Sequence, residues 1–348
     1  NGTVTGVLCG VAMYILATMQ SSPHALLLGV AVCVAMMGSC AVSGVSGALV
    51  PLVLKRLGAD PATASSIIVT TATGTEVPPR AHWLRALMAE LERLANHLLD
   101  IGAVCNDAAF AIMLAHMTVL RERILEANQA LFGHRLLMDR VVPGGVAQDL
   151  TEAGAETLRR ALGGVRKGFA RARLLYDATP SLSDRTQGTG LVSAALAHRF
   201  GAGGFVGRAS GQSHDARRAP GYPPYEALDL AVPLRQDGDV HARVVVRFDE
   251  ASESLRLINR ILLEMPAGPV AVPLEPRAGE GAALVESFRG ELLVWLRLDA
   301  AGQGAAFHAQ DPSWLQAPLL EAASEGTSGS DFPLCNKSFN CSYAGHDL

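Results

Sequence analysis

The uneven distribution of charge along this chain constrains its fold more than any single motif. Residues 1–54 contain no charged residue, and Lys55, Arg56 and Asp60 are the only ones before Glu76. The chain has 348 residues, of which 29 are basic and 33 acidic, so nearly all of the charge follows residue 75. Charge-free stretches of this length are typical of membrane-embedded segments. We therefore expect two domains, a transmembrane one over 1–74 and a water-soluble one over 75–348.

The apolar front divides into two candidate membrane spans. Residues 4–19 correspond to about one crossing of a bilayer, and residues 24–54 are long enough to cross with tilt. Lys55 and Arg56 then mark a cytoplasmic end, because basic residues concentrate on that side of a membrane. A third apolar helix, over 62–73, is too short to span. We expect these helices to contact the lipid bilayer; the alternative is a buried hairpin of a soluble protein.

The overall composition excludes one class of partner and favours one compartment. The formal net charge of −4 and the pI of about 6.2 provide no basic field, so nucleic acid is not an expected partner. The six cysteines follow no spacing of a disulfide framework. A reducing location on the cytoplasmic side fits this pattern.

The back of the chain is predicted to be mainly helical with a smaller β part, an α+β fold. Apolar residues at helical spacing predict helices over 83–101, 107–131, 151–176, 193–200 and 249–263. Partial alternation over 240–247 and a β-rich run over 290–298 predict two strands. Glu90 and Arg93 lie on the more polar sides of the first helix, together with Arg85 and Glu92.

Several motifs in the back carry a resemblance to a known family. They are ELERLANHL at 90–98, DIGA at 100–103, RER at 121–123, PGGV at 143–146, GTG at 188–190, RASG at 208–211, YPPY at 222–225, DPSW at 311–314 and NKSFN at 336–340. With this set, residues 76–348 resemble the large subunit of an energy-converting [NiFe] hydrogenase, or its large-subunit relative in NADH:quinone oxidoreductase (complex I).

The resemblance implies an architecture and a set of partners. It implies a helical-bundle large subunit that packs against a small iron–sulfur subunit and is attached to membrane ion-pumping subunits. It also implies a location at the bacterial cytoplasmic (inner) membrane, with the soluble part on the cytoplasmic side. Iron–sulfur clusters are then expected in the partner subunit and not in this chain.

The front resembles a different family. The stretch GALVPLVLKRLGADPATAS at 47–65, followed by Val69, Thr70 and Thr71, is similar to the last part of MgtE-type magnesium channels. In that family the final helix continues into an aspartate that faces the Mg²⁺ pore. Gly74 stands near that position here. Since hydrated Mg²⁺ requires oxygen ligands, we do not expect a working pore.

The cysteines of this chain test whether it can hold the nickel–iron centre of the hydrogenase family. A nickel–iron centre requires four thiolates from two close cysteine pairs, and this chain has no Cys-x-x-Cys. The first pair, like the quinone-facing histidine and tyrosine of complex I, belongs to the N-terminal part that channel-like sequence replaces here. We therefore expect no nickel, no catalytic residue and no cofactor firmly held by this chain.

Two groups of residues are candidates for a site. Cys335, Cys341 and His346 are candidate metal ligands, although their spacing matches no standard motif. The alternative for them is an ordered C-terminal tail against the core. Candidates for a surface that contacts the small subunit are Arg80, Arg85, Glu92 and Arg93, for which the alternative is a solvated helix face.

Other polar residues receive structural interpretations. Asn96 and His97 are interpreted as a hydrogen-bonded core pair, and Cys105 as a small core residue. We interpret residues 121–123 as part of a structural ion-pair network, with a proton path as the alternative. His214, Arg217 and Arg218 are interpreted as a solvated loop, with partner contact as the alternative.

The sequence thus favours a subunit of a membrane-associated redox complex, of the hydrogenase or NADH-quinone oxidoreductase type. It would serve as a scaffold beside iron–sulfur clusters without a nickel–iron centre of its own. Two alternatives stay open. One is a fragment of a magnesium transporter, and the other is a non-functional fusion of two partial genes joined near residue 74.

Overall fold

The computed structural model describes residues 11, 13–16, 18–19, 26–27, 30–34, 70–275 and 277–346. The chain divides into two compact units, Asn1–Ala62 and Thr63–Leu348, which are treated separately. In the first unit the described residues are helical. No helix among the described residues is both long and apolar enough to cross a membrane. The spans expected over 4–19 and 24–54 lie largely outside these residues and stay predictions.

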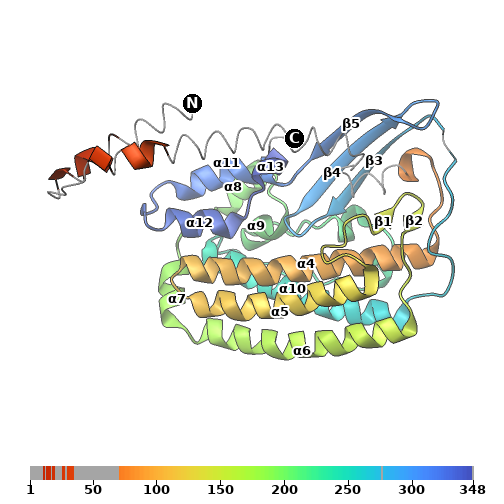
Figure 1. Cartoon of the computed structure of the whole chain (residues 1–348), viewed down its shortest axis with the longest axis horizontal. Helices are drawn as coiled ribbons and strands as arrows, with labels where there is room; N and C mark the ends of the chain where they lie inside the picture. The colour runs from red at the N-terminus through yellow and green to blue at the C-terminus, as the bar shows by residue number, and fades with distance from the viewer. Residues whose placement is uncertain are drawn as a thin grey trace. The chain divides into compact units, whose positions relative to one another are not determined.

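Four long helices form the body of the second unit. They are α4 (Pro79–Asp107), α5 (Ala111–Phe132), α6 (Glu152–Asp177) and α10 (Val240–Glu264). Figure 1 shows them stacked side by side, with α4 and α10 nearest the shorter elements. The predicted helices over 83–101, 107–131, 151–176 and 249–263 are confirmed.

Local sequence explains where these helices start and stop. Pro79 stands in the first turn of α4, where its missing N–H costs nothing. The side chains of Thr151 and Asp239 cap α6 and α10 by accepting from backbone N–H groups of Gly154 and Ala242. Gly133 ends α5 with φ of 76°, the left-handed conformation that glycine adopts without strain.

The strand predicted over 240–247 is wrong, because these residues form the first two turns of α10. Nearly all of them are buried, since neighbouring elements surround this part of the helix. The valine-rich run in this stretch alternates in part and so reads like a strand, whereas the helical spacing of Arg243 and Arg247 becomes visible only together with Glu250 and Ser254. The cap at Asp239 is the local feature that identifies the helix.

Short elements connect and cover the long helices. They are α7 (Pro180–Thr186), α8 (Ala194–Arg199), α9 (Gly204–Ala209), the π-type turn η1 (Arg217–Gly221), the 3-10 turn η2 (Tyr225–Ala227), α11 (Ser313–Ser324), α12 (Phe332–Phe339) and α13 (Tyr343–His346). The helix predicted over 193–200 corresponds to α8.

The β part is a three-stranded antiparallel sheet. Its strands are β3 (Gly279–Glu286), β4 (Glu291–Leu298) and β5 (Gly304–Gln310), in the order β3-β4-β5. The strand predicted over 290–298 is confirmed as β4, which pairs Trp295 with Ala282 on one side and with His308 on the other. A small hairpin of β1 (Val141–Val142) and β2 (Gly145–Val146) lies apart from this sheet. The expected class, mainly α with a smaller β part, is confirmed.

One glycine fixes how the sheet meets the helices. Gly204 begins α9 with φ of 61°, and a Cβ there would overlap the carbonyl oxygen of Arg289 in the β3–β4 turn. No other residue fits this close approach of two backbones. The close packing of the helical layer against the sheet therefore requires a residue without a side chain at position 204.

We predict that Gly204→Ala destabilises the second unit by about 2–4 kcal/mol, from left-handed strain and overlap together. As a control, Gly163→Ala on the exposed side of α6, where an added Cβ meets nothing, should stabilise by about 0.5–1 kcal/mol. Urea unfolding of the full chain followed by tryptophan fluorescence measures both, because Trp83, Trp295 and Trp314 are its 3 tryptophans. Equal stability of the two variants would contradict the argument.

Candidate functional site

A stripe of polar side chains on α4 faces the interior of the protein. Glu90, Arg93, His97 and Asp100 follow helical spacing and are 0%, 3%, 0% and 7% exposed. Glu90 and Arg93, placed by the sequence on the more polar sides of this helix, are therefore buried, and the solvated face offered as the alternative for Arg93 is wrong. Only Asn96, which is partly exposed, departs from the core pair expected with His97: its amide donates to the carbonyl oxygen of Glu92.

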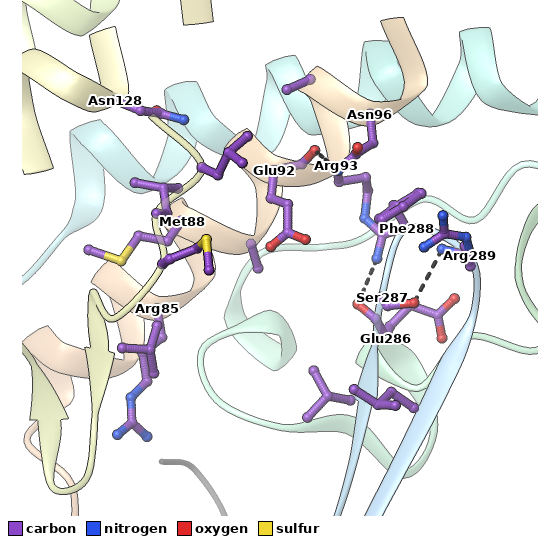
Figure 2. A pocket seen from close by; sticks show the side chains of 18 of the residues that line it. Arg85, Met88, Glu92, Arg93, Asn96, Asn128, Glu286, Ser287, Phe288 and Arg289 are labelled. Carbon is purple, nitrogen blue, oxygen red and sulfur yellow. Dashed lines mark hydrogen bonds between the residues drawn. The ribbon is translucent and has the colours of Figure 1, made fainter. Parts of the chain in front are cut away.

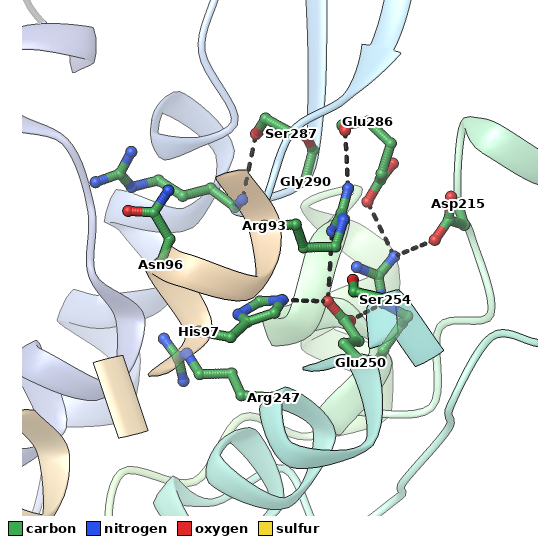
Figure 3. Close-up of polar contacts among 12 residues, drawn as sticks. Arg93, Asn96, His97, Asp215, Arg247, Glu250, Ser254, Glu286, Ser287 and Gly290 are labelled. Carbon is green, nitrogen blue, oxygen red and sulfur yellow. Dashed lines mark hydrogen bonds and ion pairs between the residues drawn. The ribbon is translucent and has the colours of Figure 1, made fainter. Parts of the chain in front are cut away.

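The Glu250 carboxylate, on α10, is the centre of this buried region (Figure 3). Its Oε1 accepts a hydrogen bond from Arg208 Nε at 2.6 Å. Its Oε2 accepts from His97 Nε2 at 2.8 Å and from Arg93 Nη1 at 3.4 Å. Three donors from α4 and α9 therefore converge on one carboxylate.

A second carboxylate, Glu90 on α4, has its own set of donors. It accepts from Arg217 Nη1 at 2.9 Å, from the Tyr225 hydroxyl at 2.7 Å and from the Ser254 hydroxyl at 2.6 Å. Arg217 also donates from Nε and Nη2 to the two oxygens of Asp215, at 2.9 and 2.7 Å. This two-point pairing is the strongest geometry available to a guanidinium.

Glu286, the last residue of β3, connects the sheet to the same cluster. Its Oε1 accepts from Arg208 Nη1 at 3.0 Å, and its Oε2 accepts from the backbone N–H of Ala216 at 3.0 Å. Its backbone carbonyl accepts from Arg93 Nη2 at 2.8 Å. We call this cluster the buried ion network; its members are Glu90, Arg93, His97, Arg208, Asp215, Arg217, Glu250 and Glu286.

The network holds Glu90, Asp215 and Glu250 ionised. Burial alone would raise the pKa of Glu250, yet Arg208 and the hydrogen bond from His97 hold it well below its ordinary value. In the same way Arg217 and Arg93 lower the pKa of Glu90 against burial. Hydrogen bonds from Arg217 overcome burial at Asp215 and bring its pKa to about 2. These three carboxylates fix geometry and are not ready to exchange a proton at neutral pH.

His97 is the exception, since it is held neutral. Burial lowers its pKa below the ordinary value, although the hydrogen bond to Glu250 acts in the other direction. With Nε2 donating to Glu250, its Nδ1 has no partner. Figure 3 shows Arg247 on the side of the ring away from Glu250. Arg247 itself lies 3.6 Å from Asp100 and stacks over the ring of Phe205.

A pocket of about 590 Å³ lies beside the network, between α4, the loop after α5 and the inner face of β3 and β4. Arg85, Glu92 and Arg93, three of the four predicted interface residues, line it (Figure 2). Arg85 donates to the carbonyl oxygens of Gly145 and Val142, and burial lowers its pKa to about 10. Contact with a partner stays a prediction for these residues.

Arg80, the fourth predicted interface residue, lies outside this pocket. Its guanidinium contacts the Asp149 carboxylate at 2.8 Å and the carbonyl oxygens of Leu150 and Pro266. These contacts attach the start of α4 to the chain before α6 and after α10. In this structure Arg80 has an internal structural role.

The predicted metal ligands at the C-terminus are only partly described. Cys335 is buried in α12, where burial raises its pKa, and Cys341 is half-buried with a pKa raised by burial to about 11. Protonated thiols are poor ligands. Within residues 70–275 and 277–346, no three His, Cys, Asp or Glu residues are grouped to hold a metal. The His346 side chain is not described, so this metal site stays a prediction. Its alternative, an ordered C-terminal tail against the core, also stays open.

Other sequence interpretations have mixed outcomes. Cys105 is buried as expected. Glu122 forms an ion pair with Arg135 at 2.7 Å on the surface. This member of the 121–123 motif therefore pairs with a residue outside the motif. His214 is exposed and lies 2.6 Å from Glu291, whereas Arg217 is 3% exposed, which makes the solvated-loop interpretation wrong for Arg217.

The structure also identifies residues that the sequence interpretation missed. Arg208, Glu250 and Glu286 were given no role, although they are central to the network. Helical spacing offered one signal, because Arg243, Arg247, Glu250 and Ser254 form a polar stripe on α10. No local pattern points to Glu286, which ends a strand.

We predict that Glu250→Ala destabilises the second unit by about 3–5 kcal/mol, because Arg208 and Arg93 each lose a buried carboxylate partner and His97 loses its acceptor. Glu250→Gln, which keeps the shape and one acceptor, should cost less. The matched control is Glu122→Gln, which breaks an exposed pair and should leave the unfolding midpoint nearly unchanged. Urea unfolding followed by tryptophan fluorescence measures all three. A small effect of Glu250→Ala would contradict a central role.

Acid should unfold the second unit, and His97 should contribute to this. Its folded-state pKa lies below 6.5, so below pH 6.5 the unfolded chain binds a proton that the folded chain does not. Stability then falls with decreasing pH, by up to about 1.4 kcal/mol per pH unit from this group. His97→Gln should flatten the loss between pH 6.5 and 5, as followed by urea unfolding. An unchanged slope would show that His97 is not held neutral.

Comparison with known proteins gives this body a family. The family model "Respiratory-chain NADH dehydrogenase, 49 Kd subunit" matches residues 107–278, and the MgtE "Divalent cation transporter" model matches residues 1–73. A carbon monoxide-induced hydrogenase of Rhodospirillum rubrum is 34% identical over 265 residues, which cover 75% of this chain and 73% of that protein. A subunit of the NADH-quinone oxidoreductase of Syntrophobacter fumaroxidans is 31% identical over 270 residues, covering 76% and 72%.

A solved structure agrees with these relatives. A chain of the membrane-bound sulfane sulfur reductase, an archaeal respiratory membrane complex, superposes with a TM-score of 0.77 at 26% identity, covering 81% of this chain and 79% of that one. Both resemblances seen in the sequence are thereby confirmed. Beyond its MgtE-like front, the chain belongs to the family that unites hydrogenase large subunits with the 49 kDa subunit of the respiratory-chain NADH dehydrogenase.

Proposed function

We propose that residues 75–348 form the large-subunit scaffold of a membrane-associated redox complex, packed against a small subunit that carries iron–sulfur clusters. The 34% identity to a carbon monoxide-induced hydrogenase over 75% of the chain carries this proposal. The structural likeness to a chain of a respiratory membrane complex supports it. The complex would also contain ion-pumping membrane subunits and lie at the bacterial inner membrane, with this body on the cytoplasmic side.

The residues present do not fit a nickel–iron centre. Such a centre needs two close pairs of thiolates. The free cysteines among the described residues are Cys33 in the first unit and Cys105, Cys335 and Cys341 in the second. Cys105 lies inside the helical bundle with a pKa raised to about 12 by burial, and the other two are on the C-terminal segment. We propose that the scaffold functions without its own nickel.

The contribution of this chain would then be geometric and electrostatic. The buried ion network fixes α4, α9, α10 and the end of β3 relative to one another, and thereby fixes the pocket beside Arg93. A rigid surface of this kind holds a partner's clusters at a constant distance from whatever group receives the electrons. The chain supplies position, and the partner supplies redox chemistry.

The MgtE match over residues 1–73 supports a second candidate, transport of Mg²⁺. Asp60 is the only acidic residue in that stretch, so a hydrated cation would find one carboxylate. We therefore favour the redox scaffold. Mg²⁺ uptake by liposomes that contain the full chain would support the second candidate, and sequencing across the codons for residues 65–85 in source DNA would show whether the join is natural.

Affinity purification of the tagged full chain from solubilised membranes of its source tests the proposal. We expect a small subunit with iron and acid-labile sulfide to co-purify, and nickel to stay far below one atom per chain. Membranes without the tagged chain, treated identically, are the control. Absence of any iron–sulfur partner would contradict the scaffold role, and stoichiometric nickel would contradict the missing centre.

A further inference from the structure

The pocket beside the buried ion network has an excess of positive charge. Apart from the members of that network, its charged lining residues are Arg85, Arg121, Arg289 and Glu92. None of the three arginines forms a salt bridge within the described residues. Glu92 is exposed, and its charge acts on Arg93 and Arg289. Arg85 and Arg121 therefore line the pocket with no carboxylate of the described residues in contact with them.

Arg85 is the guanidinium best prepared to receive an anion. Its Nε and Nη2 donate to the carbonyl oxygens of Gly145 and Val142, at 3.1 and 3.0 Å. These bonds hold the group in place but leave its charge uncompensated, and burial lowers its pKa to about 10. Its Nη1 donates to no described residue and is not buried, so a ligand can reach it. A cation withdrawn from water among neutral groups favours an anion as its partner.

The surface that starts beside Arg85 is apolar. Val141 directly precedes the residue whose carbonyl oxygen binds Arg85, and Met88 lies one turn further along α4 (Figure 2). Leu136 and Met138, which also line the pocket, are 53% and 51% exposed. The volume of about 590 Å³ lies within the range of about 300–1,000 Å³ that is typical of small-molecule sites. The pocket therefore fits a molecule with one anionic end and an apolar remainder.

We propose that the pocket binds a single-chain amphiphile with a carboxylate head, such as a fatty acid, whose head pairs with Arg85 and whose chain lies against Met88 and Met138. Such a molecule supplies the negative charge that the guanidinium lacks and removes apolar side chains from water. A phosphate monoester head is disfavoured, because Glu92 lies in the same pocket and repels its second charge. This inference adds a ligand site to the chain and does not depend on the iron–sulfur partner.

Photolabelling of the wild-type full chain in membranes of its source tests the head group. Dodecanoate with a diazirine in its chain should label peptides that contain Met88 or Met138, and excess unlabelled dodecanoate should block this labelling. The same chain with a trimethylammonium head should label these peptides about tenfold less, because it brings like charges together. Dodecyl phosphate should compete more weakly than dodecanoate. Equal labelling by the cationic probe, or dodecyl phosphate as the better competitor, overturns the proposal.

Substitutions test the part of Arg85. We expect Arg85→Gln to reduce labelling by the dodecanoate probe about tenfold, through the loss of one charged hydrogen bond. Arg121→Gln, which breaks no hydrogen bond among the described residues, should reduce it about threefold by removing a nearby charge. The control Arg123→Gln, on the exposed side of α5 and outside the pocket, should leave labelling unchanged.

Urea unfolding followed by tryptophan fluorescence shows which of these variants fold. A folded Arg85→Gln chain that is labelled like the wild type overturns the proposal. If Arg85→Gln does not fold, unchanged labelling of Arg121→Gln overturns it instead. Labelling that appears only after partner subunits are stripped from the membranes also overturns it, because an acidic polypeptide would then be the occupant.

Discussion

The contact between Arg208 and Glu250, two fully buried ions 2.6 Å apart, sets the arrangement of the second unit. Removing these charges from water costs several kcal/mol each, which their mutual attraction offsets only in good geometry with the remaining bonds satisfied. The other members of the network supply most of those bonds, while Arg208 Nη2 is buried without a hydrogen bond among the described residues. The cluster therefore contributes little net stability over an apolar core, yet any arrangement that separates its members is strongly disfavoured. Its effect is on which fold forms.

That constraint reaches the sheet and the pocket. Glu286 ends β3 and accepts from Arg208, so the end of the sheet nearest the helices is fixed to α9. Arg93 belongs to both features, since its Nη atoms bind Glu250 and the backbone of Glu286 while the residue also lines the pocket. Because the same guanidinium serves the network and the pocket wall, the pocket's shape cannot vary independently of the core. A binding surface supported in this way is pre-organised, which lowers the cost of docking.

Sequence alone predicted the long helices well and the site poorly, for one physical reason. Periodicity reports which residues avoid water, and along 83–101 and 151–176 those are apolar. It cannot report that Glu90 and Arg93 also avoid water, because that depends on Arg217 and Glu250, more than 120 residues away in the chain. For 240–247 the helical spacing of Arg243 and Arg247 becomes visible only together with Glu250 and Ser254, which lie beyond that stretch. The motif at 90–98 indicated the family through resemblance. Only the structure showed that its charged residues Glu90 and Arg93 are buried.

The network also bears on how two unrelated families can share one chain. Every member lies between Glu90 and Glu286, after the MgtE-like stretch of residues 1–73. The body therefore keeps its charge partners whatever sequence precedes it. The first thiol pair that the resemblance implies for a nickel–iron centre would instead come from the N-terminal part of the chain. In the proposed scaffold, the fold therefore does not depend on a metal, since the interactions that specify the fold and the ligands that a nickel–iron centre would need come from separate parts of the sequence.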